Sequence, residues 1–535
     1  MPDNVSEVLI VGAGASGGAF AWSLAQAGFS VTCLEQGDWL NPNTDYQTDK
    51  TDWEIHRQTD FNINPNIRNL KSDYPVNDND SPISPSMYNA VGGSTIHWSA
   101  HFPRMKPSDF KVRTLDGVAD DWPISYKDLE PYFDLNDKMM GVAGLNGDTA
   151  YPEKSPRQTN PVPLGKPGYK IASGFNQLGW HWWPADSAIN TEQYDGRAAC
   201  NNCGPCDLGC SIKAKSSVDV TYWPKAIANG AQLITNSRVK EVTLDKKGVA
   251  RGVIYYDADG NLNEHKAEII VMACNGIGTP RILLNSKSHQ FPDGLGNSSG
   301  LVGKNLMFHP YSSAQGIFDE NLEGHKGPNP LNLMSSEFYE TDLRRGFVRG
   351  YSYQVARSSS PLAVSVDIPF DIPWGEEHHD YFARVFNKTI RFAIIGEDLP
   401  ELHNEVVLDS ELTDGDGIPS PKVNYTLSEN SRRMLAHGRD NAKQVMEAAG
   451  AIDVKFVPLV QQAGWHLMGT ARMGTNPAHS VTNKYGQSHD VKNLFIVDGS
   501  LFVTSGAVNP TSTIQALALY VANYVRKNSR HILER

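Results

Sequence analysis

The residues best suited to chemistry begin at a glycine-rich turn near the start of the chain. An apolar run at residues 8–11 is followed by Gly12, Gly14 and Gly17 and by a helix-like stretch that ends near Gly28. A tight turn requires Gly12, close approach of a pyrophosphate to the backbone requires Gly14, and close packing of helix on strand requires Gly17. The free N–H groups at the start of such a helix favour phosphate. The pattern therefore predicts a dinucleotide-binding turn.

A second strand and an acidic residue complete this pattern. Residues 30–34 form another largely apolar run, and Glu35 follows it. At this position an acid accepts hydrogen bonds from the ribose hydroxyls of the nucleotide. FAD and NAD are bound by the same pattern, so this segment predicts a dinucleotide without choosing between them.

A strand and a helix near the C-terminus favour FAD. Residues 494–497 form a further apolar run, and Asp498 follows it directly. Residues 509–511, Asn-Pro-Thr, then open a long apolar stretch that predicts a helix reaching about residue 525. This pairing resembles the closing half of a flavin site, in which an acid contacts ribityl or pyrophosphate oxygens and the start of a helix points at the flavin ring.

Four further stretches extend the resemblance to a known family. They are residues 91–98, 122–132, 275–284 and 465–474. Together with the two segments above, they resemble the glucose-methanol-choline (GMC) oxidoreductases, FAD-dependent enzymes that oxidise alcohols and sugars. The first stretch, Val-Gly-Gly-Ser-Thr-Ile-His-Trp, is similar to the variant found in pyranose oxidases and sugar dehydrogenases. One departure is Lys287, which stands where the family usually has a glycine.

The resemblance implies a set of contacts with FAD. The cofactor-binding residues that it assigns are Gly12, Gly14, Gly17, Glu35, Gly92, Gly93, Ser94, His97, Val239, Asp498, Pro510 and Thr511. The backbone of Val239 is expected to touch the adenine. In some relatives the histidine that matches His97 is bonded covalently to the flavin, and in others it lies beside a noncovalently held FAD. Both alternatives stay open for this chain.

The same resemblance implies two catalytic residues. Hydride transfer from a carbinol carbon to flavin N5 requires the hydroxyl proton to leave, so a base must lie beside that oxygen. His466 matches the catalytic histidine of the family, and Asn509 matches its partner, which binds the same substrate oxygen. We expect His466 to act as the general base.

Four cysteines crowd into one short stretch and predict a metal site. Cys200, Cys203, Cys206 and Cys210 have the spacing C-x2-C-x2-C-x3-C of bacterial ferredoxin loops, except that Ser211 replaces the usual proline. Three of them, the first, third and fourth, also resemble the ligands of a 3Fe-4S cluster in the sugar dehydrogenase branch. Four close thiolates suit zinc as well. The alternatives are thus a 3Fe-4S or 4Fe-4S cluster, structural zinc, or no metal.

The order of elements and the resemblance together predict an α/β protein with an α+β substrate part, the GMC fold. A Rossmann-like FAD-binding domain is expected to interleave with a sheet-based substrate domain. The predicted FAD-binding segments are residues 1–40, 81–150, 200–310 and 460–535. The predicted substrate-binding segments are residues 151–199 and 311–459, and residues 41–80 form an excursion or lid.

Composition and the absence of certain sequence patterns indicate which partners and which cellular compartment to expect. Among 535 residues, 48 Lys and Arg stand against 60 Asp and Glu, a formal net charge of −12 without a basic block, so no nucleic acid partner is expected. No apolar run is long enough for a transmembrane segment, and no signal-peptide pattern precedes residue 8. We expect a cytoplasmic protein, with export into the periplasm beside a signal-bearing partner as the alternative.

The leading functional hypothesis is an FAD-dependent dehydrogenase of a sugar, glycoside or other alcohol. Its electrons are expected to pass to an external acceptor other than oxygen, such as a small subunit or a cytochrome, through the iron–sulfur cluster if one is present. The alternatives are an oxidase that produces hydrogen peroxide and a lyase that keeps FAD only as a scaffold. Residues 180–183, Trp-His-Trp-Trp, are expected in the core or, alternatively, around a hydrophobic alcohol.

Overall fold

The predicted glycine turn joins the first strand and first helix of a seven-stranded sheet. The computed structural model describes residues 5–48, 50–68, 70–328, 333–357, 360–366 and 372–533. Across the main path of the sheet the strands are β5 (Gln232–Ile234), β2 (Val31–Leu34), β1 (Val5–Val11), β8 (Leu262–Met272), β7 (Ala250–Tyr256) and β6 (Arg238–Leu244), and β16 (Leu494–Ile496) also pairs with β8. Five of them run parallel and include the two apolar runs predicted beside the glycines.

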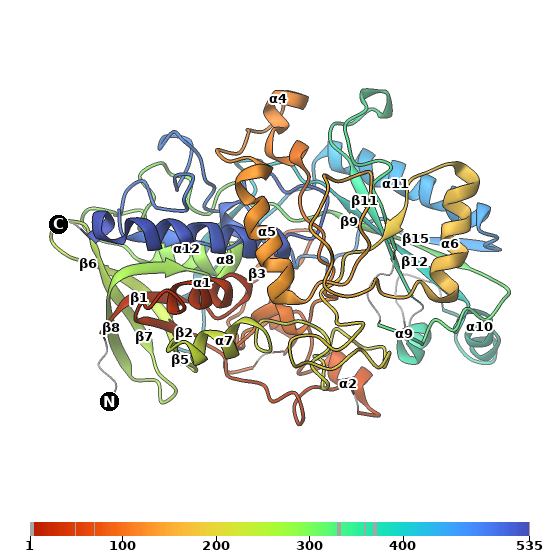
Figure 1. The fold of residues 1–535 in the computed structure, drawn as a ribbon, viewed down its shortest axis with the longest axis horizontal. Helices are drawn as coiled ribbons and strands as arrows, with labels where there is room; N and C mark the ends of the chain where they lie inside the picture. The colour runs from red at the N-terminus through yellow and green to blue at the C-terminus, as the bar shows by residue number, and fades with distance from the viewer. Residues whose placement is uncertain are drawn as a thin grey trace.

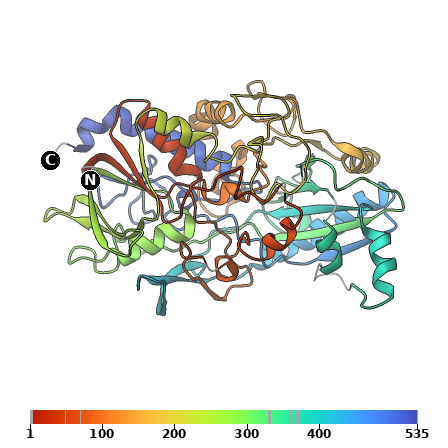
Figure 2. The same ribbon diagram turned by 90° about the horizontal axis from the view of Figure 1, so that it is seen from below.

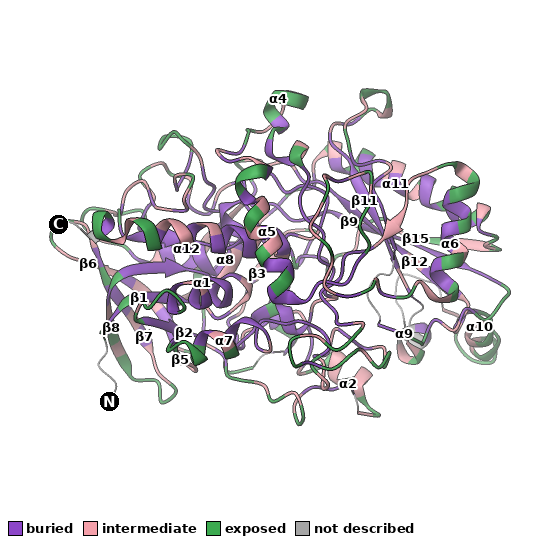
Figure 3. Ribbon diagram, viewed as in Figure 1, coloured by how far each residue is buried: buried purple, intermediate pink, exposed green. Residues whose placement is uncertain are grey.

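Helices cover both faces of this first sheet. One group consists of α1 (Ala15–Ala25), α5 (Tyr126–Met140), α7 (Tyr222–Ala228) and α12 (Thr511–Leu533), while α8 (Asn275–Asn285) packs on β6 and on a smaller sheet. The interior between these layers is buried (Figures 1 and 3). The predicted end of the last helix near residue 525 is wrong, because α12 continues through polar residues to Leu533 and buries Ile532, seven residues after the buried Val525.

A second sheet lies at the other end of the molecule (Figure 1). Its strands, in order, are β15 (Asp453–Val457), β9 (Tyr311–Ile317), β12 (Thr389–Gly396), β11 (Tyr351–Ala356), β10 (Leu333–Ser335) and β4 (Trp183–Pro184). On β11, Tyr351, Tyr353 and Val355 pack into an apolar core that includes α11 (Glu429–Ala448) and α6 (Gly165–Leu178). Gln354 and Ala356 alternate with them and face a cavity. Figure 2 shows the two sheets apart, with both chain ends beside the first sheet.

The segment predicted as an excursion is tied to the body of the protein. Its strand β3 (Asn77–Asp80) pairs with β14 (Pro419–Asn424), which in turn pairs with β13 (Glu405–Thr413). Tyr46 is buried, and its hydroxyl donates to the Asp219 carboxylate at 2.5 Å. The remaining α-helices are α2 (Trp53–Gln58), α3 (Pro65–Arg68), α4 (Val112–Asp116), α9 (Pro361–Val366) and α10 (Glu377–Val385).

The α/β fold with a sheet-based second part is confirmed by this architecture and by the structural comparisons reported below. The division into FAD-binding and substrate domains, and the lid role of residues 41–80, stay predictions. Residues 1–4, 49, 69, 329–332, 358–359, 367–371 and 534–535 of those ranges lie outside the described residues. Among the described helices, none is both long and apolar enough to cross a membrane.

Two glycines of the turn allow a matched test of packing. A Cβ on Gly17 would lie 2.0 Å from the Gly12 carbonyl oxygen, whereas a Cβ on Gly14 would have no atom within 4 Å. Alanine in place of a helix glycine gains about 1 kcal/mol of helix propensity, but overpacking costs about 1–3 kcal/mol or more where backbone must move. We expect Gly17→Ala to lower the melting temperature of the apoprotein and Gly14→Ala to leave it unchanged. Equal melting temperatures would show that α1 does not depend on this contact.

Candidate active site

A cavity of about 1100 Å³ runs from the glycine turn to the polar face of the second sheet. At one end it is bounded by the carboxyl ends of β1 and β2 and by the start of α8. At the other end it reaches Tyr311 of β9, Gln354 of β11, and Arg391 and Ile395 of β12. The first residues of α12 also reach the cavity. A cavity of this size and extent is large enough for a dinucleotide together with a small substrate.

The glycine turn opens onto this cavity. Gly12 and Gly14 line it, and Gly12 has a φ of +101°, where a Cβ would meet the Ala273 carbonyl oxygen at 2.6 Å. Because the Cβ position of Gly14 is open, a ligand can approach the backbone there. Gly17 does not line the cavity, and its effect is the close packing of α1 on the turn.

Two buried acidic residues lie beside this end of the cavity. The Glu35 carboxylate accepts hydrogen bonds from the backbone N–H groups of Ala13 at 2.8 Å and Gly37 at 2.9 Å. Burial raises the pKa of Glu35, and these two hydrogen bonds oppose that rise. Each of its oxygens accepts one bond and keeps a further acceptor position for a ribose hydroxyl.

Asp498 has a different environment from the first acid. Its carboxylate accepts from Ser500 and Thr279 and from the backbone N–H group of Asn275 at 3.1 Å, so it ties the start of α8 to the C-terminal segment. It also lines the cavity, as does Val239. Asp498, which is predicted to contact the cofactor, therefore also holds together two segments of the cavity wall.

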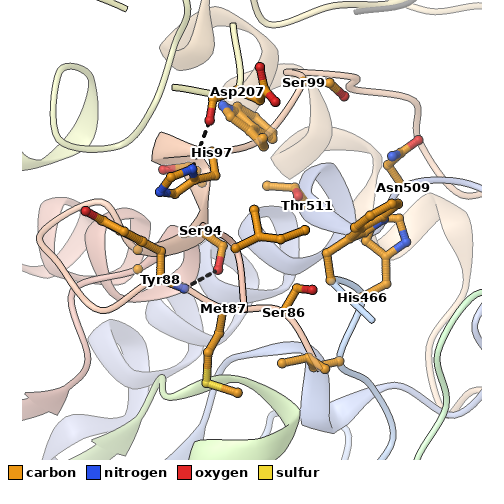
Figure 4. A pocket seen from close by; sticks show the side chains of 18 of the residues that line it. Ser86, Met87, Tyr88, Ser94, His97, Ser99, Asp207, His466, Asn509 and Thr511 are labelled. Atoms are coloured by element: carbon orange, nitrogen blue, oxygen red, sulfur yellow. Dashed lines mark hydrogen bonds between the residues drawn. The ribbon is translucent and has the colours of Figure 1, made fainter. Parts of the chain in front are cut away.

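The segment with the second glycine pair forms another wall. Gly93, Ser94 and His97 line the cavity, and a Cβ on Gly93 would lie 3.0 Å from the Gly14 Cα. Ser94 accepts a hydrogen bond from the Tyr88 N–H group (Figure 4). Gly92 does not line the cavity. Its φ of +104° serves the turn that brings its neighbours there.

His97 presents an unpaired ring nitrogen. Its Nδ1 lies 2.8 Å from the Asp207 carbonyl oxygen, so Nδ1 carries the hydrogen (Figure 4). Nε2 is buried and has no hydrogen-bond partner among the described residues. Burial and the nearby cations Arg68 and Lys215 lower the pKa of His97 to about 3, so the ring is neutral. This nitrogen is compatible with both the linked and the unlinked flavin, and the choice stays a prediction.

The structure does not support the metal site that the spacing of the four cysteines predicts. Across the described ranges, no three His, Cys, Asp or Glu side chains are grouped as a metal ion requires. Cys203 and Cys206 line the cavity, whereas Cys200 and Cys210 do not. Cys203 is exposed, whereas Cys206 is buried.

A buried lysine helps to explain the shape of this loop. The Lys215 ammonium donates to the carbonyl oxygens of Cys206 at 2.5 Å, Ile96 at 2.5 Å and Trp98 at 3.1 Å. It thereby fastens the cysteine loop to the His97 segment with the backbone carbonyls turned inward. The iron–sulfur and zinc predictions have no support from this arrangement, and we assign no step to a metal.

The two predicted catalytic residues meet at the far part of the cavity. His466 is buried and Asn509 half-buried, and both line the cavity. Figure 4 shows them at one side of the pocket, with His97 and Tyr88 at the other. The Asn509 Oδ1 accepts a hydrogen bond from the Gln354 amide. This leaves the Asn509 NH₂ group as the donor toward a ligand.

Two residues that the sequence interpretation missed orient this pair. One is Gln354, and the other is His309, whose Nδ1 lies 2.7 Å from the His466 Nδ1. Burial is the main cause that lowers the pKa of His466 well below its ordinary value, and the neighbouring His309 and His101 add to it. His466 is therefore neutral near pH 7 and has a lone pair available. The alternation of polar and apolar residues in β11 was the only sequence signal for Gln354.

Aromatic and polar side chains shape the wall beside His466. Trp465 lies edge-on to Tyr311, with ring centroids 5.5 Å apart, and Arg391 lines the same part of the cavity. The tryptophans of residues 180–183 do not line this cavity. Trp180 and Trp182 pack against the core of the second sheet, and Trp183 lines a separate cavity.

Comparison with known proteins decides the family. Two models described as GMC oxidoreductase match residues 8–311 and 400–518. The chain belongs to the GMC oxidoreductase family. It is 42% identical to 2-methyl-1,2-propanediol dehydrogenase of Mycolicibacterium austroafricanum, over 99% of this chain and 96% of that protein. It is 30% identical to the fructose dehydrogenase large subunit of Gluconobacter japonicus, over 97% of each.

A solved structure supports the same fold. Formate oxidase of Aspergillus oryzae matches with a TM-score of 0.64 at 14% identity, over 99% of both chains, and its description names FAD. The FAD cofactor and the oxidoreductase class predicted from the sequence are thus supported for this GMC oxidoreductase. The individual site residues stay predictions.

The ribose contact of Glu35 gives a direct test of the nucleotide end. Hydrogen bonds to a charged group contribute about 1.5–3 kcal/mol each, so Glu35→Ala should raise the dissociation constant of FAD by roughly 10- to 100-fold. Glu35→Gln keeps one acceptor and should have a smaller effect. FAD titration of the apoprotein measures both, with thermal melting to verify folding. Unchanged affinity in the alanine variant would contradict the assignment.

Proposed function

We propose that this GMC oxidoreductase dehydrogenates a CH–OH group of a small hydroxylated molecule, with FAD as its cofactor. In this proposal His466 removes the hydroxyl proton and Asn509 donates a hydrogen bond to the same oxygen. The observation that carries the proposal is the neutral, buried His466 beside Asn509 in a cavity continuous with the glycine turn. A base and a hydrogen-bond donor that line one cavity suit proton removal from an alcohol.

The chain offers residues that fit FAD along the cavity. Gly12 and Gly14 would lie along the pyrophosphate, Glu35 at the ribose and Val239 at the adenine. The lining residues Gly93, Ser94, His97, Asp498, Pro510 and Thr511 would hold the ribityl chain and the ring. The start of α12 lines the site, and the N-terminus of a helix favours negative charge. When bound, FAD supplies the group that accepts the hydride.

The protein residues handle the proton. Since the lowered pKa keeps His466 unprotonated near neutral pH, it can accept the substrate proton without first losing one of its own. Asn509, held by Gln354, presents its NH₂ group to the oxygen as negative charge grows there. Tyr311 and Trp465, which contact each other edge-on, form the cavity wall next to the base.

The mixture of polar and apolar residues at the second-sheet end of the cavity suggests the class of substrate. Gln354 and Arg391 offer donors, while Ile395 and Trp465 offer apolar surface. A small diol or polyol, with one hydroxyl at the base and another oxygen at these donors, matches this mixture. Two relatives named as dehydrogenases, of a propanediol and of fructose, support this class.

The assignment of the base is tested by His466→Ala. Loss of a general base lowers rates by about a hundred- to ten-thousand-fold. We expect FAD to stay bound and anaerobic bleaching of the flavin by a substrate diol to slow by that factor. His265→Ala is the control, because His265 is buried beside Ser6, outside the cavity. Bleaching at the parent rate in His466→Ala would refute the role of His466.

The electron acceptor separates a dehydrogenase from an oxidase. We expect equal turnover with an artificial acceptor in air and under argon, and little hydrogen peroxide in air without it. An external carrier, such as a small subunit or a cytochrome, would then serve as the natural acceptor. Stoichiometric hydrogen peroxide formation at a comparable rate would reassign the enzyme as an oxidase.

A further inference from the structure

A second buried histidine contacts the base from outside the cavity. His309 precedes β9 and is 1% exposed, and its ring lies nearly perpendicular to that of His466, with centroids 4.8 Å apart. Its Nδ1 lies 2.7 Å from the His466 Nδ1. Its Nε2 lies 2.7 Å from the Gly506 carbonyl oxygen and 3.3 Å from that of Ser505. Both ring nitrogens of His309 thus have a hydrogen-bond partner.

These contacts define which nitrogen of His309 carries the hydrogen. Carbonyl oxygens only accept hydrogen bonds, so Nε2 must be the donor. Burial lowers the pKa of His309 to about 4, and the ring is therefore neutral at pH 7 with a single N–H group. The lone pair then lies on Nδ1 and faces His466.

The tautomer of His466 follows from that of its neighbour. At the 2.7 Å contact one Nδ1 must donate, and His309 has no hydrogen there. The His466 Nδ1 is therefore the donor, and because His466 is also neutral, its Nε2 has the lone pair. The proton acceptor of His466 is thus Nε2, the ring nitrogen that does not contact His309.

The carbonyls that fix this arrangement are held rigidly. Ser505 exchanges hydrogen bonds with the backbone of Asp398 at 2.9 and 3.0 Å. The next residue, Gly506, has a φ of +62°, and the Ala507 N–H group donates to the Tyr339 hydroxyl at 3.1 Å. Since backbone rather than a titratable side chain sets the His309 proton, the tautomer does not depend on another ionisation.

We propose that His309 is a positioning residue that fixes His466 in the Nδ1–H tautomer and so keeps Nε2 as the base. This inference rests on the role proposed above for His466. His309 itself does not line the cavity and acts only through His466. The opposite tautomer would place two lone pairs face to face at the contact and leave no proton acceptor on Nε2.

Two substitutions of His309 distinguish a positioning role from a purely structural role. His309→Leu removes the acceptor, and His309→Asn keeps one, because an asparagine Oδ1 takes nearly the place of the histidine Nδ1. We expect the leucine variant to slow flavin bleaching at saturating substrate by roughly 5- to 150-fold, the cost of an unpaired buried donor. The KM should change little, and the asparagine variant should recover most of the rate.

Nitrogen-15 spectra of histidine provide a readout besides activity. The signals of His466 are those that disappear in His466→Ala. In the oxidised holoenzyme we expect a protonated Nδ1 and an unprotonated Nε2 for this residue, and in His309→Leu a mixture that includes protonated Nε2. This measurement needs only the unmutated holoenzyme and the His466→Ala reference if the leucine variant fails to fold.

The outcomes distinguish the inference from the function on which it rests. If no diol, polyol or sugar bleaches the flavin of the unmutated enzyme, the proposed function fails, and if His466→Ala bleaches at the parent rate, the role of His466 as the base fails and the role of His309 with it. If that variant is slow but His309→Leu is as fast as the parent, the positioning role of His309 is overturned. An Nε2–H tautomer of His466 in the unmutated holoenzyme would overturn it as well.

Discussion

The position of the cavity depends on how closely the first helix approaches the ends of β1 and β8. Gly12 and Gly17 make this approach feasible, because a Cβ on either would lie within 2.6 Å of a backbone oxygen. The approach brings Gly14 and the start of α1 to the cavity, and Gly93 then packs on Gly14. The shape of the cavity in this enzyme therefore depends on the absence of side chains at these glycines.

The second sheet and the segment that leads into it position the side chains that contact Asn509 and His466. Its polar face brings Gln354 to Asn509, and the segment leading into β9 brings His309 to His466. In the proposed reaction, His466 and Asn509 are each oriented by a residue that does not itself need to touch the substrate oxygen. Such support keeps one group as a donor and the other as an acceptor, which two freely rotating side chains would not maintain.

The sequence predicted the glycine turn and the flanking strands because their pattern is local. Gly12, Gly14 and Glu35 lie within one strand–helix–strand unit, where spacing alone indicates the geometry. The catalytic assignments of His466 and Asn509 came from a family resemblance, and both line one cavity.

Contacts between residues far apart in the chain could not be predicted from the sequence. The contact between His309 and His466 joins residues 157 apart, and the antiparallel bridge between Met307 and Met468 brings their segments together. The metal prediction from the cysteines was unsupported for a related reason. Spacing indicates how close thiols are along the chain, whereas the hydrogen bond from Lys215 to the Cys206 carbonyl oxygen ties the loop to the backbone of Ile96 across more than a hundred residues.

The central claim is that this GMC oxidoreductase breaks the C–H bond of a hydroxylated carbon with FAD as its cofactor. The most direct measurement mixes the FAD-loaded protein anaerobically with a small 1,2-diol and with the same diol deuterated at the carbinol carbon. We predict that the flavin absorbance bleaches with both and more slowly with the deuterated diol. A flavin that stays oxidised with diols, polyols and sugars alike would contradict the account.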